Sequence, residues 1–239
     1  MQNELTDKEF WSNYWSNYQF EKIPEKTVYK KYISDIKGES FIEIGGFPGI
    51  NAAYFYKNVC KDVTLLDYYI EPNIVRKFET LNNLPLGTIK CIQSDFFKFN
   101  SDQKYDIVFS FGFIEHFDDT KDVINRHINL LSEKGYLLII LPNFRGLNGF
   151  VQWIFDSKNL RSHNLDSMKI NYLKKLMSET GLKSWSVEYT RKPIIWLEPK
   201  PGITNTIGRK IIKAISYLIK IFPFKGSLLS PYIIIKAKA

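Results

Sequence analysis

The sequence predicts an α/β protein with a mostly parallel sheet, and three features of residues 1–143 support this prediction. Short apolar segments alternate with helical segments, as in parallel sheets that helices cover on both faces. The stretch FIEIGGFPGINAAYF, residues 41–55, is typical of a strand that enters a glycine-rich turn and then a helix. Acidic residues stand at the ends of the next two strands. Sheets of this kind bind ligands beyond the carboxyl ends of their strands.

The predicted elements follow one another regularly up to residue 143. Strands are expected at 40–45, 62–67, 88–95, 105–112 and 136–143, and helices at 50–58, 71–83 and 120–135. Pro72 suits the first turn of the second helix. Gly135 is expected to end the third helix.

Beyond residue 143 the pattern becomes less regular. The elements expected there are a long segment (144–165), a helix (167–181), a strand (182–190), a stretch interrupted by prolines (191–203), an amphipathic helix (205–222) and a last strand (231–239). We therefore divide the chain into an N-terminal aromatic helical cap (1–37), a core (38–190) with an insertion (144–165), a basic amphipathic insertion (191–230) and the final strand of the core sheet (231–239).

The N-terminal segment repeats the tetrapeptide W-S-N-Y at a spacing of four residues. This spacing places Trp11 with Trp15, and Tyr14 with Tyr18, on one side of a helix. The simpler interpretation is an aromatic helix packed on the main domain. The alternative is a helix that also closes over a ligand.

Composition limits the class of protein. Two cysteines, Cys60 and Cys91, form no disulfide framework and lack the spacing of metal ligands, so we expect a reducing compartment and no metal. The polar N-terminus does not resemble a signal peptide, and no stretch approaches the roughly 20 apolar residues that span a bilayer. We expect a cytoplasmic protein, with peripheral contact at the inner membrane face as an open alternative.

The order of the groups at the strand ends points to one family. Glu43 precedes the turn Gly45-Gly46-Phe47-Pro48-Gly49, Asp67 ends the second strand, and the sequence continues with S-D-F-F and D-I-V-F-S-F-G-F-I-E-H-F. Over residues 38–190 this resembles the class I S-adenosylmethionine (SAM)-dependent methyltransferases. The resemblance implies a Rossmann-like, doubly wound sheet of seven strands, mostly parallel with an antiparallel last strand. In that family the turn reads G-x-G-x-G, and Phe47 here replaces the middle glycine.

The resemblance also implies a role for each cofactor-binding residue. Gly45 lets the backbone approach the methionine part of SAM, and Gly49 lets the helix begin close to it. Glu43 orients the turn, and Gly46 supplies the freedom that Phe47 lacks. The residues that contact the nucleoside and the ammonium group are Asp67 for the ribose hydroxyls, Asp95 and Phe96 for adenine, and the turn from Ser110 for the methionine ammonium.

The acceptor side is less well defined. Methyl transfer is an in-line displacement, and a base matters only for an acceptor that carries a proton. His116 and His163 are the candidate catalytic residues, each with packing as its simpler interpretation, whereas His127 is expected to be structural. The stretch F-I-E-H-F also resembles cyclopropane fatty-acid synthases, where the Glu and His bind bicarbonate. No N-P-P-Y or D-P-P-Y tetrapeptide follows the fourth strand, which disfavours adenine or glutamine N-methylation.

The C-terminal region carries the excess positive charge of the chain. From Arg191 onward there are ten Lys or Arg and one acid, whereas the whole chain has a net charge of +8. In the helix at 205–222 an apolar side (Ile207, Ile211, Ile215, Leu218, Phe222) is opposite a basic side (Arg209, Lys210, Lys213, Lys220). This helix could pack on the edge of the sheet, contact an anionic membrane, or bind RNA.

We therefore expect a SAM-dependent methyltransferase of a small or lipid-linked acceptor, with oxygen as the methylated atom. Similarity to bacterial methyltransferases of envelope glycans and quinones is loose. The alternatives are an RNA methyltransferase, although nucleic acid is not the expected partner, a catalytically degenerate binding protein, and, more distantly, a nicotinamide-dependent enzyme.

Overall fold

The fold was analysed in a computed structural model of the 239-residue chain. The structure describes residues 15, 22–190, 193–197, 203–219 and 225–239. Of the expected N-terminal aromatic helix, only Trp15 lies within the described residues, in helical conformation.

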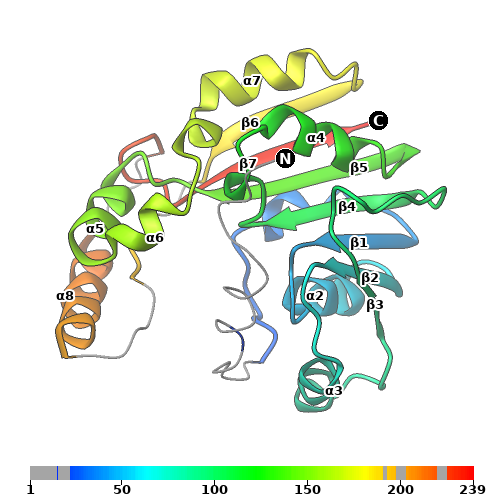
Figure 1. Ribbon diagram of the computed structural model, residues 1–239, viewed down its shortest axis with the longest axis horizontal. Helices are drawn as coiled ribbons and strands as arrows, with labels where there is room; N and C mark the ends of the chain where they lie inside the picture. Colours follow the sequence, from blue (N-terminus) through cyan, green and yellow to red (C-terminus); the bar gives the residue numbers. More distant parts are fainter. Residues whose placement is uncertain (1–14, 16–21, 191–192, 198–202, 220–224) are drawn as a thin grey trace.

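Seven strands form one sheet in the order β3-β2-β1-β4-β5-β7-β6 (Figure 1). Their bounds are β1 Ser40–Ile44, β2 Asp62–Asp67, β3 Ile89–Gln93, β4 Tyr105–Phe111, β5 Leu131–Pro142, β6 Ser184–Tyr189 and β7 Tyr232–Lys238. Strands β1 to β5 pair in parallel, and β7 runs antiparallel to both of its neighbours, β5 and β6. This confirms the predicted fold class. The strand order reverses between β1 and β4, and ligands bind at such a point in open α/β sheets.

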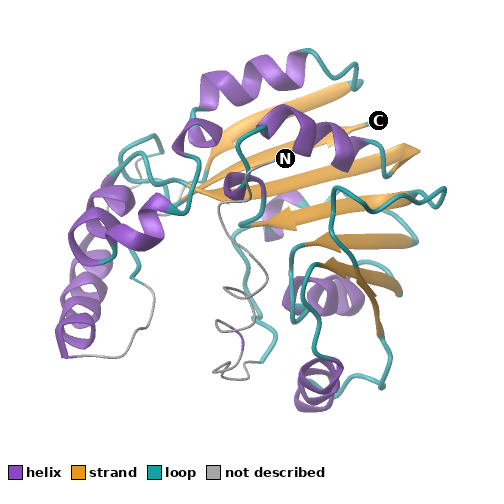
Figure 2. Ribbon diagram, in the orientation of Figure 1, coloured by secondary structure: helices purple, strands orange, loops and turns teal. Residues whose placement is uncertain are grey.

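Helices cover both faces of the sheet (Figure 2). The α-helices are α2 Ile50–Asn58, α3 Pro72–Leu81, α4 Thr120–Ile128, α5 Leu147–Phe155, α6 Ser157–Arg161, α7 Ile170–Ser178 and α8 Ile203–Ile219, and the 3-10 helices are η1 Lys30–Tyr32, η2 Ile114–His116 and η3 Leu165–Met168. Helices α2 and α3 lie on one face, and α4 and α7 lie on the other (Figure 1).

Alternate residues of each central strand enter two separate cores. On the face of α2 and α3, Phe41 stacks on Phe55 at 4.2 Å between ring centroids. On the face of α4 and α7, Ile42 and Val108 join a second cluster with Val123. Because both faces are buried, the strands are apolar throughout, which is why their positions could be predicted from sequence.

The expected helix 120–135 was wrong at its end. Helix α4 stops at Ile128, and β5 already begins at Leu131. The amide of Tyr105 donates to the Leu130 carbonyl at 2.8 Å, and Leu131 pairs with Tyr105 before the register shifts. The residues from Leu131 onward therefore pair with the start of β4 as a strand with a bulge. The helical sequence pattern that ends at Gly135 does not indicate this pairing.

The segment 144–165 and the described residues of the basic insertion form a lobe beyond the end of β5 and the start of β7 (Figure 1). Helices α5 and α8 meet there through Val151 and Ile212. The stretch 193–197 lies between them, because Asn148 donates to the Ile194 carbonyl at 2.9 Å and Ser216 accepts from the Ile195 amide at 3.1 Å. Among the helices that the structure describes, none is long and apolar enough to cross a membrane.

Candidate active site

A cleft opens at the carboxyl ends of β1, β2, β3 and β4, where the strand order reverses. It is lined by Trp15, Ile44, Gly45, Leu66, Asp67, Tyr68, Ser94, Asp95, Phe96, Phe97, Gly112, Phe113, His116 and Phe117. Of the residues expected at the cofactor, Gly45, Asp67, Asp95 and Phe96 are in this lining. Of the two candidate catalytic histidines, His116 is in it as well.

Two glycines of the turn adopt conformations that a side chain would disfavour. Gly45 has φ +67°, and a Cβ there would lie 2.1 Å from the Phe113 ring. Gly49 has φ +97° at the start of α2, and its Cβ would meet Ile89 at 2.9 Å. Gly45 therefore lies in the cleft wall with the Phe113 ring packed closely against it, an approach that only glycine permits.

Glu43 and Gly46 act together behind the turn and lie outside the cleft lining. The Glu43 carboxylate is fully buried and accepts from Asn51 Nδ2 at 2.7 Å and from the Ala52 amide at 2.8 Å. A Cβ on Gly46 would lie 1.9 Å from Glu43 Oε1, so the glycine is required for this packing. Burial raises the pKa of Glu43 to about 8, although the two hydrogen bonds oppose the shift.

Phe47, the departure from the glycine pattern, points away from the cleft. Its side chain is buried and makes edge-on contacts with Trp15 at 5.1 Å and Tyr69 at 5.6 Å between ring centroids. It is absent from the cleft lining. The bulky residue therefore joins the hydrophobic core and does not narrow the cleft.

Asp67 joins the glycine turn to the end of β2. Its Oδ2 accepts from the Phe47 amide at 2.9 Å, and its Oδ1 accepts from the Tyr69 amide at 3.0 Å. Each oxygen keeps a further lone pair for a ligand donor. Burial is the main cause that raises the pKa of Asp67, to about 6, against the opposing backbone hydrogen bonds.

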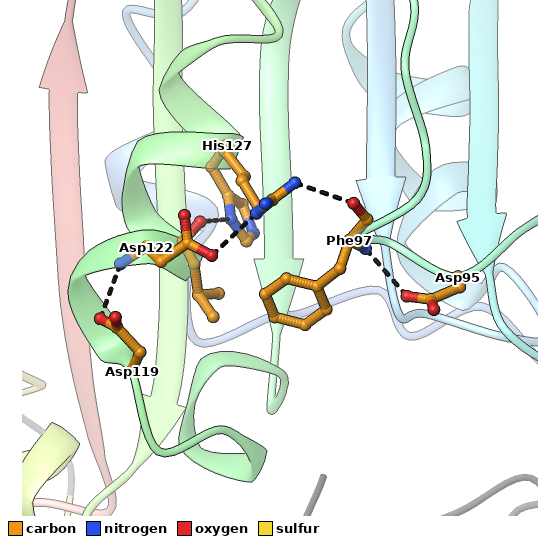
Figure 3. A network of polar contacts seen from close by, with 7 residues as sticks. Asp95, Phe97, Asp119, Asp122 and His127 are labelled. Atoms are coloured by element: carbon orange, nitrogen blue, oxygen red, sulfur yellow. Dashed lines mark hydrogen bonds and ion pairs between the residues drawn. The ribbon is translucent and has the colours of Figure 1, made fainter. Parts of the chain in front are cut away.

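The loop after β3 is braced by α4. Asp95 Oδ1 accepts from the Phe97 amide at 2.9 Å, and Arg126 donates to the Phe97 carbonyl at 3.0 Å while pairing with Asp122 at 2.9 Å (Figure 3). The Arg126 guanidinium also lies over the Phe97 ring, 5.0 Å from its centroid. This network fixes the backbone that carries Asp95 and Phe96 on the cleft wall.

Ser110 lies outside the cleft lining. It is fully buried, and its hydroxyl is 3.0 Å from His127 Nε2. His127 Nδ1 lies 2.8 Å from the Val123 carbonyl, which can only accept, so Nε2 receives the hydrogen from Ser110. Burial lowers the pKa of His127 to about 4. Gly112, two residues further on, is the residue of this turn that borders the cleft.

His116 and His163 come together although 47 residues separate them in the sequence. Their ring centroids are 4.7 Å apart. His116 lies on the cleft wall, whereas His163 lies behind it and packs edge-on against Phe144 at 5.0 Å. Burial and the neighbouring His163 lower the pKa of His116 to about 3, so its imidazole is neutral. Burial also lowers the pKa of His163.

Several residues of the site were not predicted from sequence. Tyr68, Phe97, Phe113 and Phe117 give the cleft aromatic walls, together with Trp15, which belongs to the segment with ligand closure as its alternative interpretation. Tyr68 directly follows the strand-end acid, which is a usable signal. The two phenylalanines after Gly112 could have been found only by following the chain past the end of β4.

Comparison with known proteins adds the decisive observation. The model of the methyltransferase domain family matches residues 14–187, most of the chain. The chain belongs to this family. The predicted family and enzyme class are thereby confirmed. The methyltransferase uses SAM as its cofactor. A comparison with curated protein sequences finds no match.

Solved structures of low sequence identity share the fold. A SAM-dependent methyltransferase from Archaeoglobus fulgidus is 19% identical, with a TM-score of 0.57 over 88% of this chain and 91% of that chain. A possible histamine N-methyltransferase from Thermotoga maritima is 16% identical, with a TM-score of 0.57 over 88% and 86%. The phosphoethanolamine N-methyltransferase 2 of Haemonchus contortus, solved with S-adenosylhomocysteine (SAH), is 15% identical, with a TM-score of 0.60 over 88% and 51%.

The residues of the cleft fit this cofactor. Gly45 brings backbone into the cleft wall, Asp67 offers two carboxylate oxygens, and Phe96 and Phe97 offer apolar surface for a base. The methyltransferase therefore retains the groups that a nucleoside with an amino acid tail requires, despite Phe47.

Proposed function

We propose that this methyltransferase transfers the methyl group of SAM to a hydroxyl of a small or lipid-linked acceptor. The observation that carries the proposal is the meeting of Gly45, Asp67, Asp95 and Phe96 in one cleft at the switch point of the sheet. Holding the two reactants in line at short distance supplies most of the acceleration of such a displacement.

Each cofactor residue has a distinct part in this proposal. Asp67 accepts both ribose hydroxyls, Asp95 accepts from the adenine amino group, and Phe96 contacts the ring. The backbone at Gly45 and Gly112 borders the methionine part. Glu43, Gly46 and Gly49 act indirectly, because they hold the turn and the first turn of α2 in place.

Oxygen as the methylated atom is supported by the surroundings of His116. A neutral imidazole on the cleft wall can accept a hydrogen bond from a hydroxyl. Behind this wall, ring contacts run from His116 through His163 and Phe144 to Trp196. An acceptor that enters from the lobe would meet these groups beside the methyl group of SAM.

A lipid-linked acceptor is supported by the exposed apolar side of the lobe. On α8, Gly208, Ile212 and Ser216 are buried, whereas Ile207, Ile211, Ile215 and Leu218 are exposed. On α5, Trp153 is 64% exposed, and Phe150 and Ile154 are exposed beside it. Apolar surface of this kind, with a basic side chain row on the same helix, suits an anionic membrane. The simpler interpretation of the sequence packs the apolar side of this helix on the edge of the sheet. It is wrong for the four exposed residues of α8 named above.

The test is a transfer assay with matched acceptors. Methyl-labelled SAM is incubated with phenolic, glycan and lipid-linked hydroxyl compounds, and with analogues in which the hydroxyl is replaced by hydrogen or by an amine. We expect label in a hydroxyl compound and none in its deoxy analogue. Transfer only to amines, or only to RNA, would contradict the proposed acceptor class while leaving the cofactor assignment intact.

A further inference from the structure

Glu115, His116 and His163 form a cluster at the end of the cleft that the cofactor does not explain. Potential ligand atoms of the three side chains all lie within 4.8 Å of one another. In the part of the chain that the structure describes, this is the one group of three such residues with that spacing. No residue spacing indicates this cluster, because His163 comes from the distant segment after α6.

The hydrogen bonds of the two imidazoles define which ring nitrogen can act as a ligand. His116 Nδ1 lies 3.3 Å from the Ser162 carbonyl, and His163 Nδ1 lies 2.6 Å from the Asn159 carbonyl. A carbonyl only accepts, so each Nδ1 carries the hydrogen and each neutral ring has its lone pair on Nε2. Backbone carbonyls orient metal-binding histidines in this way.

Glu115 brings a carboxyl group into the same place. Its side chain is only 1% exposed, and its Oε2 has no hydrogen-bond partner among the described residues. A buried carboxylate without a partner is unfavourable unless a proton or a cation accompanies it. With a cation bound, the cluster offers one carboxylate and two nitrogen lone pairs, and all of these are acceptors that can serve as metal ligands.

The geometry points to a divalent transition-metal site formed by Glu115, His116 and His163, of the class that binds Zn²⁺ or Co²⁺. Two imidazoles and one carboxylate are a common ligand set for metals that keep an open position for water or substrate. Ligand bonds of about 2.0–2.2 Å place neighbouring ligand atoms roughly 3.3 Å apart in a tetrahedral site. The ligand atoms of the cluster lie within 4.8 Å of one another. Side-chain rotations would bring them to the separation that a tetrahedral site requires.

The two segments that carry the ligands are fixed to each other. The Asn164 amide donates to the Glu115 carbonyl at 2.7 Å, and Asn164 Nδ2 donates to the Phe117 carbonyl at 2.9 Å. These bonds hold the residue after His163 against the residues on both sides of His116. The cluster is therefore built into the fold before any ion binds.

Because His116 also lines the cleft, a metal bound there would border the acceptor, and it would replace the direct hydrogen bond between His116 and the acceptor hydroxyl. This role depends on the proposed function: an acceptor hydroxyl bound to the metal would lose its proton to water more readily. The alkoxide oxygen would then form the new C–O bond as the C–S bond of SAM breaks and SAH leaves. Metal binding itself does not depend on that reaction.

The test is a titration of the chelator-treated full chain with Co²⁺, followed by its visible absorption and by displacement with Zn²⁺. We expect one equivalent to bind, and Glu115→Gln and His163→Ala to weaken binding roughly tenfold or more. Asp118→Asn removes a nearby exposed charge, and Cys91→Ser removes an exposed thiol, so both controls should bind as the wild type does. Thermal unfolding of each variant shows that the fold is intact.

Three outcomes would overturn the site: no binding of Co²⁺ or Zn²⁺ by the wild type, equal binding by the wild type and both cluster variants, or loss of binding in Cys91→Ser alone. Stoichiometric binding that needs Glu115 and His163, without methylation of any hydroxyl, would support the metal site and count against the proposed acceptor. Hydroxyl methylation by a protein that binds no metal would support the proposed acceptor and contradict the metal site.

Discussion

Asp67 shows how one side chain can serve both the fold and the ligand. It accepts hydrogen bonds from the Phe47 and Tyr69 amides, and so holds the glycine turn against the end of β2. The same residue lies in the cleft lining. Burial makes the carboxyl a better base than an exposed aspartate, because its pKa rises to about 6.

This raised pKa predicts a pH dependence of cofactor binding. Ribose hydroxyls donate to the ionised carboxylate, so a protein with protonated Asp67 must release a proton to bind. Affinity for SAH should therefore fall as the pH drops through 6 and be about tenfold weaker at pH 5 than at pH 7. Calorimetry at the two pH values measures this, and Asp67→Asn should remove most of the difference. A wild-type affinity that is the same at both pH values would contradict the assignment.

Glu43 makes a different prediction, for stability. Its pKa in the folded protein is raised to about 8 from 4.5, so the folded state holds a proton that the unfolded state has lost. Its contribution is therefore complete below about pH 4.5 and is lost as the pH rises through 8. We expect the melting temperature of the wild type to fall relative to Glu43→Gln between pH 6 and pH 9. Parallel melting curves of the two proteins across that range would show that Glu43 stays ionised in the fold.

Among the secondary-structure elements, α4 has the clearest indirect role in the site. It does not line the cleft, yet Arg126 ties it to the loop after β3 by an ion pair with Asp122 and a bond to the Phe97 carbonyl (Figure 3). On the other side of the helix, His127 is buried against Phe96 and Ser110. The helix thus positions the residues expected at adenine.

Removing this brace should loosen the adenine end of the site. For Arg126→Ala we expect the KM for SAM to rise about threefold to tenfold, which corresponds to one or two hydrogen bonds, with a smaller change in kcat. Arg126→Lys keeps the charge near Asp122 but loses the planar fork, so its effect should be intermediate. An unchanged KM in Arg126→Ala, or a fall in kcat alone, would count against this role.

At the scale of the whole molecule, the cofactor cleft and the exposed apolar side of the lobe lie beyond the same edge of the sheet. The lobe of α5 and α8 extends from the end of β5 and the start of β7 (Figure 1). Half of the Ile211 surface is exposed, at 50%, near the middle of α8. An acceptor held in a membrane could therefore approach the cleft without leaving the lipid surface.

Vesicle sedimentation tests the membrane contact. We expect the wild type to sediment with vesicles that contain anionic phospholipid, and Ile211→Glu to remain largely in the supernatant because a charge replaces apolar contact. Lys213→Gln, on the basic side of the same helix, should lower binding less, and raising the salt concentration should reproduce its effect. Equal sedimentation of the wild type and Ile211→Glu would exclude this surface as the lipid contact.

The sequence predicted the core sheet well because buried parallel strands are apolar and strand-end acids are easy to recognise. Gly45, Asp67, Asp95 and Phe96 reach the cleft for that reason. Ser110 does not, since a pattern cannot tell that its hydroxyl turns toward His127. The meeting of His116 with His163 could not be predicted, because it depends on how α5 and α6 return the chain to the end of β4.

The central claim is that the cleft binds SAM through Asp67 despite Phe47. Calorimetric titration of the wild type and Asp67→Ala with SAM and SAH tests it most directly. We predict binding of both ligands to the wild type and a loss of roughly tenfold to hundredfold in Asp67→Ala, as expected for charge-assisted hydrogen bonds. No binding to the wild type, or equal affinity in the folded variant, would contradict the account.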